Sequence, residues 1–138
     1  MMINSYKLID KDLILSEGQT LPNNTAVDST NVVNFVSAAG GRLKIEVRAA
    51  TAISIADSKQ LKIVASFGAT SSPTDTKRKV LFDRTASGSA FTFAQGDLIC
   101  SEILDQDMLG TDEYVKLTYT TTDDEQLEKV DAYLCAIA

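Results

Sequence analysis

The feature that most constrains this chain is a two-residue alternation of apolar and polar side chains. In residues 43–48, three aliphatic side chains alternate with three charged ones. Residues 61–67 and 115–120 repeat the pattern, the latter with threonine at two polar positions. Successive side chains of a β-strand point to opposite faces, so this period predicts strands with one buried face.

Composition and turn signals predict five further strands. They are residues 31–35, 78–83, 90–93, 97–104 and 129–137. Turn signals rich in Gly, Pro, Asp or Ser separate the strands, such as residues 39–41 and 87–89. About eight short strands separated by turns predict a single all-β domain over residues 1–138, built as a sandwich or barrel.

The first 24 residues have two interpretations. They begin with an apolar group and end in the polar stretch 16–24, which contains Pro22. The apolar residues are Leu8, Ile9, Leu13, Ile14 and Leu15. Such a segment fits an N-terminal arm that lies on another subunit, and it fits equally well a first strand in the protein's own sheet.

Charge and composition argue against several classes of function. The formal net charge is −6 and the chain contains no histidine. Nucleic-acid binders concentrate Lys and Arg, so nucleic acid is not expected as a partner. Histidine is the commonest general base and metal ligand, and no Gly-rich phosphate-binding motif is present. The sequence therefore predicts no enzyme, no cofactor and no metal site.

One acidic segment and two cysteines are the remaining candidate sites. Residues 105–113 begin like an EF-hand calcium loop, but Leu109 stands at the fifth position and Lys116 replaces the closing Glu. We expect an ordinary acidic loop there. Cys100 and Cys135 lie in apolar stretches without a Cys-x-x-Cys motif, which predicts reduced, buried thiols, with a disulfide between neighbouring strands as the alternative.

No apolar run is long enough to cross a bilayer, and the first residues lack the apolar core of a secretory signal. We therefore expect a protein that is synthesised in a cytoplasm and has no membrane partner.

Three short motifs carry a resemblance to a known family. Residues 10–19 place an Asp before the triplet Leu-Ile-Leu, followed by Ser, Glu and Gln. Residues 28–33 read Asp-Ser-Thr-Asn-Val-Val, and residues 113–119 read Glu-Tyr-Val-Lys-Leu-Thr-Tyr. Together they resemble the small jelly-roll cement, or staple, proteins that decorate the heads of some short-tailed bacteriophages. The family's Gly-Ala-rich stretch is only short here, at residues 37–41.

The resemblance implies both a fold and a function. The implied fold is a jelly-roll β-sandwich of about eight antiparallel strands. The implied function is that of a capsid decoration protein on the outer surface of the virion, with the major capsid protein as its partner. Copies of such proteins are often paired, so a homo-oligomer is expected, as a dimer rather than a trimer. An acidic chain is compatible with this role because basic patches on a capsid lattice can steer it.

Contacts with the capsid or another subunit are expected on loops and on the N-terminal segment. The candidate residues are Tyr6, Leu8, Ile9, Leu13, Ile14, Lys77, Arg78 and Lys79. The three cations also fit a solvated loop or the guard of an edge strand. The alternative function is a β-sandwich module of a phage tail that binds carbohydrate or a receptor. Such a module normally presents aromatic residues, and this chain has no Trp.

Overall fold

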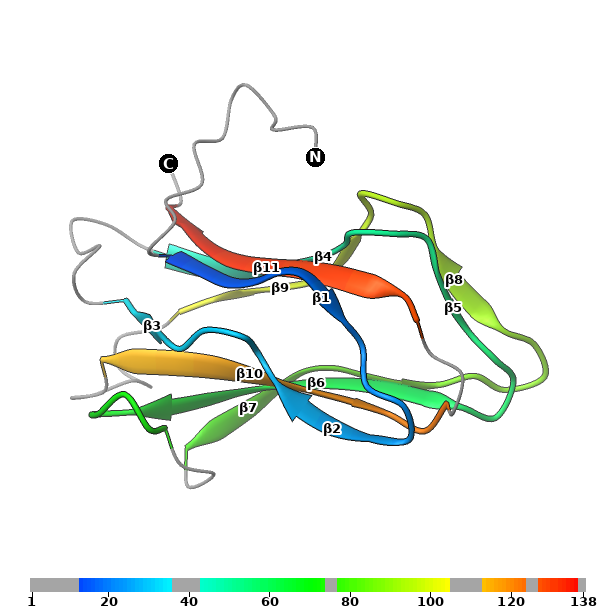
Figure 1. Ribbon diagram of the computed structural model, residues 1–138, viewed down its shortest axis with the longest axis horizontal. Coiled ribbons are helices and arrows are strands. Elements are labelled where there is room, and N and C mark those ends of the chain that lie inside the picture. Colours follow the sequence, from blue (N-terminus) through cyan, green and yellow to red (C-terminus); the bar gives the residue numbers. More distant parts are fainter. Residues whose placement is uncertain (1–12, 36–42, 74–76, 105–112, 124–126, 137–138) are drawn as a thin grey trace.

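The computed structural model describes residues 13–35, 43–73, 77–104, 113–123 and 127–136. Within these ranges the chain forms eleven strands and no α-helix, and every strand pairing is antiparallel. Two sheets lie face to face (Figure 1). The prediction of an all-β sandwich is therefore confirmed.

The first layer is a four-stranded sheet in the order β1-β11-β4-β9. Its strands are β1 (Ile14–Thr20), β11 (Lys129–Ala136), β4 (Leu43–Ala49) and β9 (Leu98–Ile103). The alternation in β4 has the predicted effect, because Leu43, Ile45 and Val47 are all buried.

The second layer is a five-stranded sheet in the order β2-β10-β6-β7, with β3 also pairing with β10. Its strands are β2 (Thr25–Asp28), β10 (Tyr114–Thr121), β6 (Gln60–Gly68), β7 (Arg78–Thr85) and β3 (Val33–Asn34). The long strands β6 and β10 lie next to each other at its centre, so their alternating apolar residues line the interior.

A separate two-stranded sheet completes the fold, made of β5 (Ile53–Ile55) and β8 (Phe91–Phe93). It lies at the end of the sandwich drawn on the right of Figure 1. Each of the eight segments predicted as strands coincides with a strand of the structure. Three further strands bring the total above eight: β2, which is exposed at all four positions and shows no alternation, β5, and β1, for which the sequence left an arm as the alternative.

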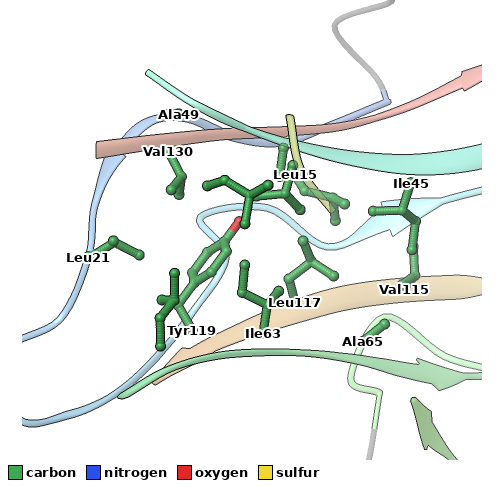
Figure 2. Close-up of a cluster of buried hydrophobic side chains, with 14 of the residues drawn as sticks. Leu15, Leu21, Ile45, Ala49, Ile63, Ala65, Val115, Leu117, Tyr119 and Val130 are labelled. Atoms are coloured by element: carbon green, nitrogen blue, oxygen red, sulfur yellow. The ribbon is translucent and has the colours of Figure 1, made fainter. Parts of the chain in front are cut away.

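The core lies between the two main sheets. Figure 2 shows its centre, where Leu15, Ile63 and Leu117 approach one another from both layers. Tyr119 is fully buried, and its hydroxyl lies 2.8 Å from the Ser16 hydroxyl. A buried polar group is costly unless it is hydrogen-bonded, so this pair places a matched polar contact inside an apolar core.

The structure places residues 14–20 in the protein's own sheet. β1 pairs with β11, Leu15 is fully buried, and Leu21 just beyond the strand is 2% exposed. The apolar side chains of Leu15 and Leu21 in this part of the N-terminal segment therefore pack inside the sandwich. The arm interpretation of residues 1–12 lies outside the described residues.

Candidate functional site

One side of the sandwich is closed by hydrogen bonds between the outer strand β1 and residues 28–31, and we call it the bridged edge. The Gln19 side chain donates to the carbonyl of Asp28 at 2.8 Å and accepts from the backbone N–H of Thr30 at 2.9 Å. The backbone N–H of Asn31 donates to the carbonyl of Leu15 at 3.0 Å. Backbone groups that would otherwise face water at the edge of β1 are thus satisfied within the chain.

The opposite side, where the outer strands β7 and β9 lie next to each other, is the open edge. Lys79 of β7 and Glu102 of β9 form an ion pair across it. In the register of each sheet, Lys79 stands opposite Ala65 and Glu102 opposite Ile45, both fully buried residues. Directly opposite residues share a face, so the two charges lie on the inward faces of their sheets.

Apolar side chains are exposed at the open edge. Val80 on β7 is 49% exposed, while Leu98 and Ile103 on β9 are 43% and 46% exposed. Half-buried Cys100 packs against the core from β9, and burial, with a smaller contribution from Glu102, raises the pKa of its thiol to about 12. The open edge thus combines a paired charge with uncovered apolar surface.

The outer face of the four-stranded sheet carries a polar cluster formed by Lys44, Glu46, Arg48 and Tyr133. The Tyr133 hydroxyl donates to Glu46 Oε2 at 2.8 Å, and Arg48 Nε donates to the Tyr133 hydroxyl oxygen at 3.0 Å. Lys44 Nζ lies 3.0 Å from Glu46 Oε1. Glu46 is only 2% exposed although its strand position points outward. Burial, helped by the hydrogen bond to Glu46, raises the pKa of Tyr133 to about 12.

This cluster changes how the charged face of β4 is understood. The sequence predicts a charged face on this strand, and the structure joins its three charges to one another and to a tyrosine from the neighbouring strand β11. The sequence contained one signal for this cluster, the alternation in β11, which places Tyr133 on the face of the sheet opposite to that of Ala132 and Leu134. The pairing with β4 could not be read from the sequence.

The cationic candidate residues do not share one environment. Lys77 and Arg78 are exposed at the start of β7, whereas Lys79 is half-buried in its ion pair with Glu102. That all three cations contact a partner stays a prediction, and Lys79 already has an acidic partner within its own chain. Alternation along the strand turns this side chain into the space between the sheets.

The N-terminal candidates are divided as well. Leu13 packs against the core and Ile14 is half-buried opposite Tyr133, while Tyr6, Leu8 and Ile9 lie outside the described residues. β1 and β7 are outer strands of different sheets and lie on opposite edges of the sandwich. Among the described candidates, Leu13 and Ile14 are therefore not brought together with Lys77, Arg78 and Lys79 into one surface.

The two cysteines, Cys100 and Cys135, form no disulfide. Both are half-buried, whereas buried thiols were expected. No group of three or more acidic or cysteine residues in the described parts of the chain could hold a metal ion, and the acidic loop 105–112 lies outside them.

Among the residues that the structure covers, no helix is long and apolar enough to span a membrane. A scan of protein-family models finds none that matches the chain, and a search of curated proteins finds no similar sequence.

Proposed function

We propose that this protein is a capsid decoration protein that binds the outer surface of a tailed-phage head and reinforces it by bridging major capsid protein subunits. We also propose that its sandwich is a jelly roll. The proposed function rests on the three short sequence motifs together with the strand order. The proposed jelly roll rests on the strand order alone.

The strand order supports a jelly roll as follows. If β2 and β3 are taken as one interrupted strand and the β5–β8 pair as an addition, eight strands remain, four in each sheet. The first and last strands, β1 and β11, are neighbours, and so are β2 and β10. A jelly roll contains eight strands in two sheets, wound as two Greek keys, and viral capsid domains are among the proteins that use it.

The exposed surface is compatible with a role in binding rather than catalysis. Lys77 and Arg78 present two cations at the end of the five-stranded sheet in a chain of net charge −6. They could contact acidic side chains on a lattice whose basic patches attract the rest of the protein. A protein that touches two or more capsid subunits combines modest contacts into slow dissociation, and it stabilises the assembled shell by mass action.

The tail-module alternative receives less support from the aromatic residues. Each Phe and Tyr in the described ranges is buried or half-buried. Phe82, Phe91 and Phe93 pack on one another with ring centroids 5.9 to 6.3 Å apart, and Arg84 lies 4.5 Å from the centroid of the Phe91 ring. These three rings pack against one another, whereas a carbohydrate-binding site needs an aromatic ring with an accessible face.

The decisive experiment mixes the purified protein with undecorated heads of its own phage. The number of bound copies and the temperature of shell disruption are measured, and both should rise to a plateau. Arg78→Glu should weaken binding, and Lys129→Glu is the matched control because Lys129 is also exposed and the charge change is the same. No binding to heads, or binding to host-surface glycans instead, would contradict the proposal.

A further inference from the structure

The four outer strands of the two main sheets differ in how their free edges are protected. An unprotected edge presents backbone N–H and C=O groups to any other strand, and natural proteins guard it with charges, irregular pairing, short strands or covering segments. β1 is bridged by Gln19 and Asn31 and has two register shifts. β2 has only four residues. β7 carries exposed Arg78, Asp83 and Arg84 and has a register shift in its pairing with β6.

β9 has little of this protection. Its single charged residue, Glu102, is bonded to Lys79 on the inward side. The side chains of Leu98 and Ile103 are exposed on its outward side. A register shift opposite Val47 and Arg48 affects only its beginning, so the strand is regular from Cys100 onward.

The hydrogen-bond pattern shows which backbone groups of β9 face outward. The N–H of Leu104 donates to the carbonyl of Leu43 at 2.9 Å. Along an antiparallel strand, alternate residues bond to the neighbour, so Ser101 and Ile103 direct their N–H and C=O groups away from β4. Among the described residues, no strand pairs with β9 on that side.

We propose that β9 is the strand through which two copies of this chain pair, antiparallel and about a two-fold axis near Ser101. The four-stranded sheets of the two copies then join into one continuous sheet. A two-fold axis brings the same segment of each copy against itself, which an antiparallel strand pair satisfies naturally. The exposed, small Ser101 side chain at the centre leaves room for its counterpart.

The distribution of charge favours a second copy of the chain as the partner and β9 as the pairing strand. Two copies of net charge −6 repel each other, so they associate best where each presents no uncompensated charge. At β9 the only acidic side chain is already neutralised by Lys79 of its own chain. Pairing also covers apolar surface at Leu98 and Ile103 of both copies, which is favourable in water.

The inference does not rest on the capsid role, because it is tested on the purified protein. Sedimentation velocity at physiological salt over a range of concentrations should show the wild type as a dimer, with twice the 14.9 kDa mass of one chain. Ile103→Lys should raise the dissociation constant of the dimer about tenfold or more, since it puts a charge in each copy where pairing would cover apolar surface, and 1.4 kcal/mol is a factor of ten.

Two further variants separate strand pairing from general surface effects. Val80→Lys is the matched control, because Val80 is similarly exposed on the neighbouring outer strand β7, and it should leave the dimer intact. Ser101→Pro removes an N–H that points away from β4 and should also give monomers. Circular dichroism and thermal unfolding verify that each variant remains folded.

Three outcomes would overturn the proposal. The first is a wild type that stays monomeric at every concentration. The second is a dimer that survives both Ile103→Lys and Ser101→Pro as folded proteins, which would place the interface elsewhere. The third is a monomeric wild type that loses binding to phage heads on Ile103→Lys, which would assign β9 to an extended segment of the capsid instead.

Discussion

The bridged edge and the open edge close the same sandwich in different ways. At the bridged edge, Gln19 and Asn31 tie β1 to residues 28–31, and Leu15 is fully buried beside them. At the open edge, the link between β7 and β9 includes the Lys79–Glu102 ion pair, and apolar side chains remain exposed. One side is thus closed by hydrogen bonds within the chain, while the other leaves apolar side chains exposed among the described residues.

The two kinds of closure should differ in their contribution to stability. Hydrogen bonds that satisfy backbone groups near a core contribute about 0.5 to 1.5 kcal/mol each, whereas a partly exposed ion pair typically contributes about 0 to 1 kcal/mol. The following changes test that difference.

The largest effect is expected from Leu15→Ala in β1. Leu15 is fully buried, so the substitution should lower the free energy of unfolding by ~2–5 kcal/mol through lost burial and the cavity left behind. Val80→Ala on β7 is the matched control, because its side chain is 49% exposed and the change should stay within about 0.5 kcal/mol. Denaturant unfolding measures both, and equal losses would erase the contrast between the edges.

The next effect is expected from Gln19→Leu, which keeps the side-chain size and removes the amide. It removes the hydrogen bonds to the Asp28 carbonyl and the Thr30 N–H, which are exposed, and we expect a loss of ~0.5–1.5 kcal/mol. Gln60→Leu is the control, because its amide donates to the exposed carboxylate of Asp83, a flexible partner that water can replace. If thermal unfolding showed the same loss of stability for Gln60→Leu as for Gln19→Leu, the hydrogen bonds of Gln19 would have no special role in closing the bridged edge.

A smaller effect is expected from Lys79→Met together with Glu102→Gln at the open edge. The side chains of Lys79 and Glu102 are 40% and 28% exposed, so solvent screens their attraction. A double-mutant cycle should give a coupling free energy of ~0–1 kcal/mol that decreases with added salt. A coupling well above this range, unaffected by salt, would show that the open edge is closed as firmly as the bridged one.

The smallest effect near neutral pH is expected from the Cys100 thiol. Burial raises its pKa from the ordinary value of 9.0 to about 12, so the neutral thiol stabilises the fold fully below pH 9. This contribution is lost as the pH rises toward 12. In a Cys135→Ser background, alkylation of native Cys100 should stay slow until strongly alkaline pH. Fast reaction with a midpoint near 9 would mean that water already penetrates the open edge.

Strands with strict alternation were predictable from the sequence, as β4 and β10 illustrate. β2 was not, because its four residues are all exposed and carry no period. The contact surface was predictable only in part, since Lys77, Arg78 and Lys79 form one basic run. The partner of Lys79 is Glu102, which lies 23 residues away on the other sheet. Local charge pattern carries no information about which strands meet across a sandwich.

The position of β11 also determines the order in which the protein can be completed. This strand is the last of the described strands and lies between β1 and β4, so the first sheet lacks one of its two inner strands until residues 129–136 have been synthesised. While residues 129–136 are still inside the ribosome, β1 and β4 have no neighbour on their facing edges. Non-local strand pairing of this kind is slow and leaves edges open to other chains. Folding to the native sandwich must therefore wait until residues 129–136 have left the ribosome, and nascent chains that lack this strand would be the stage most prone to aggregation.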